Sequence, residues 1–376
     1  MSGEQPTPAN NSLFKGIFAG RRVLLTGHTG FKGAWLALWL NALGAEVAGY
    51  ALEPPTQPNL FDELKLADMI ARHEIGDVRD AARLESVFAA FRPEIVFHLA
   101  AQSLVRRSYS EPQLTYETNV MGTLNLFEAV RGCDSVRVVV NVTSDKCYEN
   151  REQDYAYHED DPLGGYDPYS SSKGCAELLT AAYRSSFFGP EAAVSLASAR
   201  AGNVVGGGDW AEDRLIPDCV RALSHGQTIA VRNPGAVRPW QFVLEPLAGY
   251  LFLAASMWQG GHRFDGPWNF GPDNNGEMPV RQVVETAVAA WGSGGWQGPD
   301  AGAVEPHEAR LLKLDCAKAR EFLGWQPVYE ATTALAATMA WYKAFYAGDT
   351  DMVSVSQADI DEYVKWATGG RVAWTR

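Results

Sequence analysis

The segment RVLLTGHTGFKG, residues 22–33, carries the clearest indication of the fold. An apolar run from Val23 to Leu25 is followed by three glycines at the spacing Gly27-x-x-Gly30-x-x-Gly33, and then by an apolar stretch with helical periodicity. Glycines between a strand and a helix allow a tight turn, and they let a pyrophosphate approach the amides at the helix N-terminus. The segment therefore predicts the first strand–helix unit of a dinucleotide-binding domain.

The alternation of strand and helix continues through the first half of the chain. Four further β-rich runs and two long helical stretches follow, at 46–50, 94–99, 136–142 and 193–199, and at 112–131 and 168–187. Strands alternating with helices of this length indicate a parallel sheet covered by helices on both faces. We expect an α/β fold, namely a Rossmann-type doubly wound parallel sheet with a smaller C-terminal substrate-binding lobe.

After about residue 203, glycine and proline residues divide the chain into shorter segments. Two helices are predicted there, at 280–291 and 331–347, and a third near 359–367. The predicted parts are a flexible tail at 1–17, the cofactor domain at 18–203, to which 238–258 returns, the lobe at 204–237 and 259–349, and a tail at 350–376.

Composition excludes several classes of protein. The chain has 376 residues and a net charge of -13, whereas a sequence-independent nucleic-acid binder is expected to be basic. The longest apolar run, 247–258, falls short of the roughly 20 residues of a membrane-spanning helix, and the polar start resembles no signal peptide. The five cysteines are scattered and the histidines lack ligand spacing, so we expect no disulfides and no metal. A cytoplasmic protein that contacts neither nucleic acid nor membrane is expected.

The second β-rich run bears on which dinucleotide binds. Glu53 lies slightly later than the acidic residue that usually holds the adenosine ribose, and no arginine stands there to pair with a 2′-phosphate. NAD is therefore favoured over NADP. Asp77 has two interpretations that the sequence leaves open: it accepts a hydrogen bond from the adenine amino group, or it caps a helix or turn.

Tyr169 and Lys173 are predicted to form a catalytic pair. Residues four apart lie on one helix face, so the ammonium can approach the phenol oxygen and lower its pKa from about 10. A tyrosinate tuned in this way can take a proton from a sugar hydroxyl. The same spacing is common on solvated helices, but here it lies between two strands of the predicted sheet.

A second polar cluster, Ser144-Asp145-Lys146, follows the strand predicted at 136–142. Ligands of open α/β sheets bind at the carboxyl ends of the strands. A hydroxyl, a carboxylate and an ammonium in succession at such an end therefore predict a reactive site, and the alternative is a polar loop with a chance ion pair. Cys147 is interpreted as a small buried residue rather than a nucleophile, and His98 as structural.

Five stretches together resemble the extended short-chain dehydrogenase/reductases: 27–33, 98–103, 119–123, 169–173 and 200–206. The resemblance runs from about residue 18 to residue 346. Within this superfamily of nucleotide-sugar dehydratases and epimerases, residues 26–33, 144–148 and 238–241 are most similar to the CDP-glucose 4,6-dehydratases. Those enzymes carry Asp-Lys where dTDP-glucose and GDP-mannose dehydratases carry Asp-Glu, and this chain has Asp145-Lys146.

The resemblance implies NAD as cofactor and CDP-glucose as substrate, in deoxysugar biosynthesis of the kind that supplies O-antigen lipopolysaccharide. The residues implied to bind the cofactor are Gly27, Thr29, Gly30, Phe31, Lys32, Gly33, Asp77, Val78, Leu99, Ala100, Ala101, Tyr169 and Lys173. The residues implied to bind the substrate are Ser103, Asn203, Arg214, Leu215, Ile216, Arg232, Arg238 and His307. Guanidinium groups suit a diphosphate because their paired donors match phosphate oxygens.

The resemblance also implies the catalytic roles. Tyr169 would deprotonate the glucose 4-hydroxyl during oxidation by NAD, with Ser144 bonded to the same oxygen and Lys173 bridging Tyr169 and the nicotinamide ribose. Neutral Lys146 would then take the C5 proton, while protonated Asp145 helps the 6-hydroxyl leave as water. The product would be CDP-4-keto-6-deoxyglucose.

Several alternatives remain open at this point. A 4-epimerase would need Tyr169 and Lys173 but no elimination pair, and a non-catalytic NAD-binding scaffold would need neither. The helices at 112–131 and 168–187 are similar to those that pair between subunits in the superfamily, so a homodimer is expected, with a tetramer not excluded. Phe242 departs from the family's usual histidine.

Overall fold

The fold is described from a computed structural model covering residues 10–272, 277–299 and 311–376. Seven parallel strands form the main sheet in the order β11-β7-β5-β4-β1-β2-β3. Their bounds are β1 Arg22–Thr26, β2 Glu46–Ala51, β3 Arg72–Ile75, β4 Ile95–His98, β5 Val138–Val142, β7 Ser195–Ala201 and β11 Gly266–Phe270. This strand order reverses between β1 and β4, which confirms the predicted doubly wound sheet.

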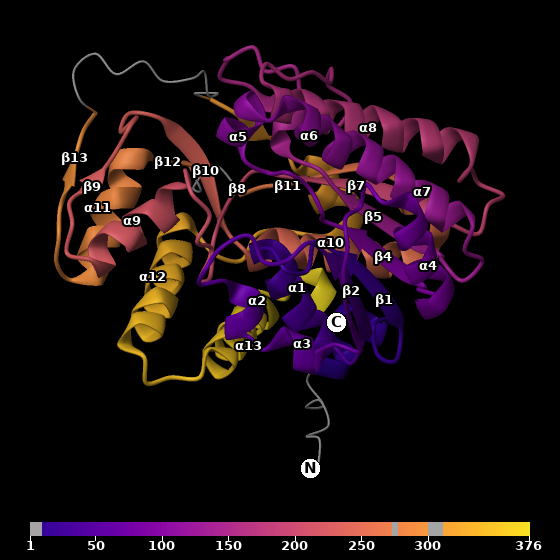
Figure 1. The fold of residues 1–376 in the computed structure, drawn as a ribbon, viewed down its shortest axis with the longest axis horizontal. Coiled ribbons are helices and arrows are strands. Elements are labelled where there is room, and N and C mark those ends of the chain that lie inside the picture. The colour runs from indigo at the N-terminus through magenta and orange to yellow at the C-terminus, as the bar shows by residue number, and fades with distance from the viewer. Residues whose placement is uncertain (1–9, 273–276, 300–310) are drawn as a thin grey trace.

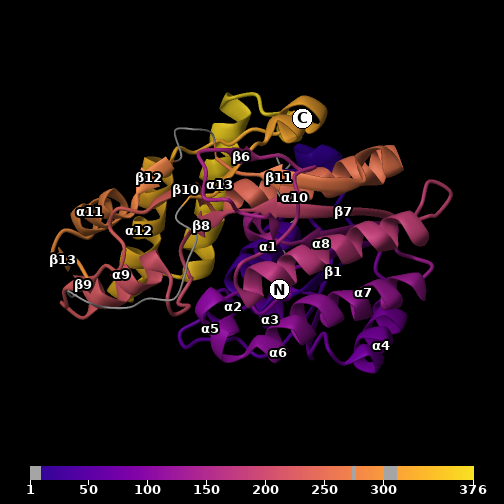
Figure 2. The ribbon, with the colours of Figure 1, turned by 90° about the horizontal axis from the view of Figure 1, so that it is seen from above.

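Helices cover both faces of the sheet (Figures 1 and 2). One face packs against α1 (Phe31–Ala42) and α10 (Leu244–Gly260), and the other against α4 (Ala81–Phe91), α7 (Gly122–Arg131) and α8 (Pro168–Ser186). Alternate residues of β1 illustrate this: Val23 and Leu25 belong to one hydrophobic core, and Leu24 belongs to the other. Strands buried on both faces explain why the apolar runs lack strict alternation.

The helix predicted at 112–131 is continuous but irregular. It consists of α6 (Pro112–Tyr116), a π-helical turn (Glu117–Met121) and α7. No pattern in the sequence predicts this π-helical turn, although such turns occur frequently at functional sites. Strands β3 and β11 were not predicted either, because each is short and bears polar or glycine and proline residues.

The second lobe contains small sheets and three further helices. Strands β8 (Asn203–Val205), β10 (Val237–Phe242) and β12 (Glu277–Pro279) form one sheet; β9 (Ile229–Ala230) pairs with β13 (Trp296–Gln297), and β6 (Ala156–Tyr157) with β14 (Lys313–Leu314). The helices are α9 (Leu215–Ser224), α11 (Val280–Trp291) and α12 (Ala331–Ala347). Strands β9, β12 and β13 lie with these helices at one end of the molecule in Figure 1. The bounds of α11 and α12 confirm the prediction.

Both ends of the described chain pack onto the cofactor domain. Helix α13 (Met352–Gly369) is longer than predicted and contacts α1 and α12, while the helical segment η1 (Asn10–Gly16) contacts the C-terminal turn η7 (Ala373–Thr375). Phe14 is buried and stacks on Trp374 with 5.1 Å between ring centroids. The predicted N-terminal tail is therefore too long, since Leu13 and Phe14 belong to the core. Within the described ranges, no helix is long and apolar enough to cross a bilayer.

Truncation of Trp374 tests this docking. Its ring is fully buried and contacts Phe14, Trp39 and Tyr363. We expect Trp374→Ala to lower the free energy of unfolding by about 3–5 kcal/mol, because the substitution removes apolar contacts and leaves a cavity. Urea denaturation measures the loss. Trp366→Ala, at a half-exposed position of α13, is the matched control, and an equal loss in both variants would contradict the buried docking.

Candidate active site

The glycine loop at the start of α1 is shaped to admit a pyrophosphate. Gly27 has a φ of +79°, and a Cβ atom there would lie 2.8 Å from the backbone nitrogen of Ala100. A Cβ on Gly33 would overlap the carbonyl oxygen of Gly27. Gly30 caps α1 without a side-chain hydrogen bond, so the first helical amides remain available to an anion. The loop fits the predicted dinucleotide.

The other predicted cofactor residues follow neighbouring strands. Leu99, Ala100 and Ala101 come directly after β4, which pairs with β1, so they lie beside the glycine loop. The hydroxyl of Thr29 donates to the carbonyl of Leu52 at 2.8 Å and thereby ties the loop to the end of β2. Val78 is buried after β3. These residues converge on the carboxyl edge of the sheet, where dinucleotides bind in such folds.

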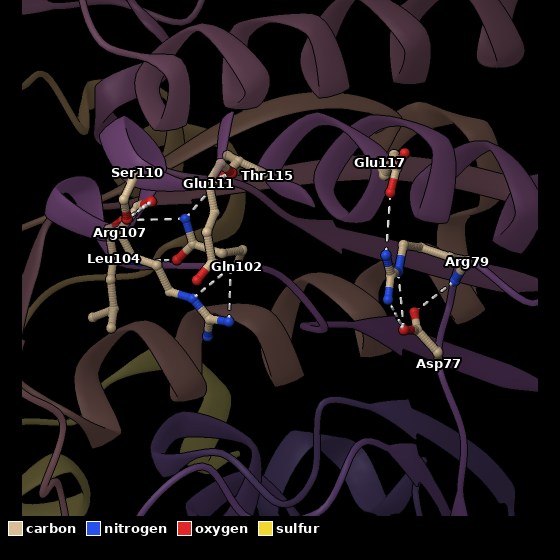
Figure 3. Close-up of polar contacts among 9 residues, drawn as sticks. All are labelled: Asp77, Arg79, Gln102, Leu104, Arg107, Ser110, Glu111, Thr115 and Glu117. Carbon is tan, nitrogen blue, oxygen red and sulfur yellow. Dashed lines mark hydrogen bonds and ion pairs between the residues drawn. The ribbon is translucent and has the colours of Figure 1, made fainter. Parts of the chain in front are cut away.

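Asp77 is held by its neighbour Arg79 (Figure 3). One carboxylate oxygen accepts from the Arg79 backbone nitrogen at 2.9 Å, and the other accepts from the guanidinium at 2.6 Å. Arg79 also reaches Glu117 in the π-helical turn at 3.1 Å. Asp77 therefore stabilises the turn after β3, whereas helix α4 is capped by Asp80. The contact of Asp77 with adenine stays a prediction.

Ser144, Asp145 and Lys146 form a compact hydrogen-bonded group after β5. The Ser144 hydroxyl donates to Oδ1 of Asp145 at 2.9 Å, and Nζ of Lys146 lies 3.3 Å from the same oxygen. The Asp145 side chain is almost fully buried, whereas that of Lys146 retains 21% exposure. A Cβ on Gly202 would lie 2.9 Å from the other carboxylate oxygen. The carboxylate is therefore enclosed, while the ammonium faces the open side.

Tyr169 lies on the first turn of α8, which begins where Asp167 caps it through the Ser170 amide at 2.9 Å. Burial raises the pKa of the Tyr169 phenol, while the charge of Lys146 and a hydrogen bond with Ser144 act to lower it. Both effects indicate that the Tyr169 phenol lies close to Ser144 and Lys146. The sequence alone did not predict that Lys146 would act on the phenol.

Lys173 lies one turn further along α8 and is buried. Its Nζ donates to the carbonyl of Val142 at 3.3 Å, at the end of β5. Burial lowers the pKa of Lys173 to about 8, and the nearby Glu177 carboxylate opposes the shift. In this structure the charge of Lys146 acts to lower the pKa of the Tyr169 phenol, and the effect of Lys173 on that pKa stays a prediction.

A pair that the sequence did not suggest, Lys32 and Tyr250, borders the same site. Nζ of Lys32, in the glycine loop, donates to the Tyr250 hydroxyl on α10 at 3.0 Å. Burial lowers the pKa of Lys32 to about 7, and the charges of Lys173 and Arg214 add to the shift. The only signal in the sequence is a lone tyrosine within the apolar run of α10.

The lowered pKa of Lys32 makes folding stability depend on pH. The unfolded chain, with the ordinary lysine pKa of 10.5, binds a proton between pH 7 and pH 10.5 that the folded protein does not. Lys32 therefore costs most stability at or below pH 7. We expect Lys32→Met to raise the urea midpoint of the NAD-free protein at pH 7 and to raise it less at pH 9. An equal change at both pH values would contradict the assigned shift.

Arg214 joins the lobe to the cofactor domain. Its guanidinium pairs with Asp209 at 2.8 Å and donates to the Ser103 hydroxyl at 3.1 Å, so two predicted substrate residues meet. Arg214 also precedes α9, whose first residues are the predicted Leu215 and Ile216. The arrangement places a cation between the lobe and the loop after β4.

The remaining predicted substrate residues are more dispersed. Arg232 pairs with Asp213 at 2.6 Å, and Asp213 lies 3.6 Å from Arg106 of α5 (Val105–Ser110), which the sequence did not single out. Arg238 lies on β10, and Asn203 opens the paired strand β8. His307 lies outside the described residues.

His98, Cys147 and Phe242 are buried residues that supply no reactive group to the site. His98 is structural, as predicted, because its ring nitrogens bond Thr26 and Thr123 at 2.7 and 3.1 Å and burial lowers its pKa to about 3. Burial raises the pKa of the Cys147 thiol, consistent with a buried residue rather than a nucleophile. Phe242 packs on Tyr329 in the core, so the site draws no polar group from this position.

Gln102 fixes the loop that carries Ser103 (Figure 3). Its side-chain nitrogen donates to Thr115 at 2.9 Å and to the carbonyl of Leu104 at 3.1 Å. Asn119, in the π-helical turn, accepts from the Gln102 backbone and donates to Ser172 on α8 at 2.8 Å. The irregular helix therefore connects the loop after β4 to the helix that carries Tyr169.

Comparison with known proteins places this site in a family. The sequence pattern of the GDP-mannose 4,6 dehydratase family matches residues 24–338. A CDP-glucose 4,6-dehydratase from Salmonella typhimurium is 50% identical over 358 residues, which cover 94% of this chain and 99% of that protein.

Solved structures agree with this placement. A dTDP-glucose 4,6-dehydratase from Streptomyces venezuelae, solved with NAD bound, has a TM-score of 0.70 and 27% identity over 86% of this chain and 97% of its own. A UDP-glucose 4-epimerase from Thermus thermophilus, at 24% identity over 88% of this chain and 100% of its own, shares the fold with a TM-score of 0.72. The chain therefore belongs to the GDP-mannose 4,6 dehydratase family, within the extended short-chain dehydrogenase/reductases.

Proposed function

We propose that this protein is a hydro-lyase that converts CDP-glucose into CDP-4-keto-6-deoxyglucose with NAD as a cofactor regenerated in each cycle. The observation that carries the proposal is the contact between Asp145 and Lys146 beside Ser144 and Tyr169. An elimination needs an acid and a base that an epimerase does not. The 50% identity to a CDP-glucose 4,6-dehydratase supports the same substrate.

The first half of the reaction is assigned to α8 and Ser144. NAD held in this site would supply the hydride acceptor for C4 of the sugar and the hydride donor for C6. Tyr169 takes the proton of the 4-hydroxyl, and Ser144 donates to the developing C4 oxygen. Lys173, buried below them, supplies a positive charge for the nicotinamide ribose. The glycine loop and the loop after β4 supply the backbone amides that bind the pyrophosphate.

The second half is assigned to Asp145 and Lys146. The C4 ketone acidifies the C5 proton, which neutral Lys146 removes, while Asp145 donates its proton to the departing 6-hydroxyl. Their contact at 3.3 Å allows a proton to pass between the two side chains. Partial exposure of Lys146 leaves its Nζ accessible to a sugar, whereas Asp145 stays enclosed.

The substrate diphosphate is assigned to Arg214, Arg232 and Arg238. The chain as a whole carries a net charge of -13, so an anionic substrate requires a local concentration of cations. Arg214 lies close enough to influence the Tyr169 phenol, which supports its place beside the sugar end of the site. Asn203, Ser103, Leu215 and Ile216 remain the proposed neutral contacts.

A homodimer formed through α6, α7 and α8 is part of the proposal. Large apolar side chains are exposed along these helices and the turn between them: Tyr116, Met121, Leu178 and Phe187. Because α6 and α7 both contact α8, we assign these exposed side chains to the dimer contact. Light scattering should give twice the mass of the chain for the unmodified protein and the monomer mass for Met121→Glu/Leu178→Glu; a monomeric unmodified protein would contradict the dimer.

Incubation of the protein and NAD with CDP-glucose, dTDP-glucose, GDP-mannose and UDP-glucose tests the function. We expect a 4-keto-6-deoxy product, identified by mass and NMR, from CDP-glucose in preference to the other three. Conversion to a 4-epimer would favour the epimerase alternative. Binding of NAD without any conversion would favour a non-catalytic scaffold.

A further inference from the structure

Beneath the active site lies a buried ion pair that the proposed chemistry does not use. Glu177, on α8, and Arg200, on β7, approach to 2.8 Å, and each side chain is only 3% exposed. A buried ion pair gives little net stability, because the desolvation of both groups offsets their attraction. Its position therefore matters more than its contribution to stability.

Each member of this pair holds one end of the segment that carries the elimination residues. The Thr143 hydroxyl donates to Glu177, and the Tyr148 hydroxyl accepts from Arg200 at 2.7 Å. Thr143 directly precedes Ser144-Asp145-Lys146-Cys147, and Tyr148 directly follows it. The hydrogen bonds of Thr143 and Tyr148 therefore hold the two ends of the reactive segment on the same ion pair.

The anchors are fixed in turn by further hydrogen bonds. Glu177 accepts from Ser198 of β7 at 2.7 Å, and Arg200 donates to the carbonyl of Glu159 at 2.9 Å. The Tyr148 hydroxyl donates to Asn269 of β11 at 2.8 Å. Because Ser198 and Asn269 belong to the neighbouring strands β7 and β11, these bonds fix the ends of the reactive segment relative to the sheet.

Helix α8 carries both Glu177 and the residues assigned to C4 chemistry. Glu177 lies one turn beyond Lys173 and two turns beyond Tyr169. The bond from Thr143 to Glu177 therefore sets how far Asp145 and Lys146 lie from Tyr169. Asp145 and Lys146 themselves occupy a single short turn, Asp145–Cys147, in which the Ser144 hydroxyl and the Lys146 ammonium both contact Oδ1 of Asp145.

We propose that Glu177, Arg200, Thr143 and Tyr148 form a positioning clamp that places Asp145 and Lys146 for the elimination step. The proposal rests on the proposed dehydratase function. Of the groups assigned to C4 oxidation, only Ser144 lies in the clamped segment, whereas Tyr169 and Lys173 are held by α8 itself. Loosening the clamp therefore impairs elimination more than C4 oxidation. Misplacement of a catalytic group by about 1 Å lowers a rate by about 10²-fold.

Tyr148→Phe and Thr143→Val test the clamp, because each removes one hydroxyl and leaves the ion pair itself in place. We expect each variant to form the 4-keto-6-deoxy product about 10²-fold more slowly. Incorporation of solvent deuterium at C5 should fall with it, while reduction of NAD on addition of CDP-glucose in a single turnover should be retained. Thr143→Ser, which keeps the hydroxyl, should restore most of the lost rate.

Tyr157→Phe is the matched control. Tyr157 stacks on Tyr148 at 5.1 Å between ring centroids, but its hydroxyl contacts Arg151 and Asn150 rather than the ion pair. This variant should retain wild-type turnover. Clamp variants with wild-type turnover, or with C4 oxidation and elimination reduced by the same factor, would overturn the clamp.

Turnover by the unmodified protein separates a failure of the clamp from a failure of the proposed dehydratase function. If it converts CDP-glucose while the clamp variants match it at every step, only the clamp is wrong. If the unmodified protein with NAD gives no 4-keto-6-deoxy product, the dehydratase function is wrong and the clamp loses its catalytic role with it.

Discussion

Lys146→Ala is expected to abolish dehydration of CDP-glucose while leaving oxidation at C4 in place. Without the Lys146 amine no base removes the C5 proton, and general-base catalysis contributes about 10²–10⁴-fold to a rate. Reduced NAD should therefore accumulate after addition of CDP-glucose, with no solvent deuterium at C5 and no loss of water. Absorbance of the reduced cofactor, together with mass spectrometry of the sugar nucleotide, measures both effects.

Two comparisons make this prediction specific. Lys343→Ala removes an exposed lysine of α12 whose Nζ donates to the Ala290 carbonyl, and it should behave like the unmodified protein. Thermal unfolding of Lys146→Ala should show that the fold persists, since Lys146 is partly exposed. Full turnover by Lys146→Ala would remove Lys146 from the mechanism.

Tyr169→Phe has an effect of similar size but at the first step. The substitution keeps the buried ring and removes the oxygen that accepts the C4 hydroxyl proton, so neither oxidation nor elimination can proceed. We expect a loss of about 10²–10⁴-fold in product formation and no accumulation of reduced NAD. Single-turnover absorbance measurements separate this pattern from that of Lys146→Ala.

Tyr183→Phe is the control on the same helix. The Tyr183 hydroxyl donates to Glu128 of α7 at 2.5 Å, away from the reactive group, so its removal should leave turnover unchanged. If Tyr169→Phe still reduced NAD at the wild-type rate, another group would have to accept the proton, and the assignment of the base would be wrong.

The features that the sequence predicts correctly depend on residues close together in the chain. The strand, glycine turn and helix at 22–42 are encoded in one segment, and so are Tyr169 and Lys173, because a spacing of four brings them to one helix face. Ser144, Asp145 and Lys146 are contiguous. The doubly wound sheet follows from repetition of such local units.

The features that the sequence does not predict depend on contacts between distant segments. The Lys32–Tyr250 hydrogen bond requires α10 to pack beside α1, and the Glu177–Arg200 pair requires α8 to cross β7. Similarly, the anchoring of η1 and η7 follows from the stacking of Phe14 on Trp374. No local pattern identifies the partners in these contacts, because the tertiary packing determines which residues meet.

An isotope followed through one turnover tests the dehydratase function most directly. CDP-glucose deuterated at C4 is incubated in ordinary water with the protein and NAD, and the product is analysed by NMR. We predict a single 4-keto-6-deoxy sugar nucleotide with the deuterium transferred to C6 and a proton at C5. A product that keeps its 6-hydroxyl, with deuterium still at C4, would contradict the dehydratase account.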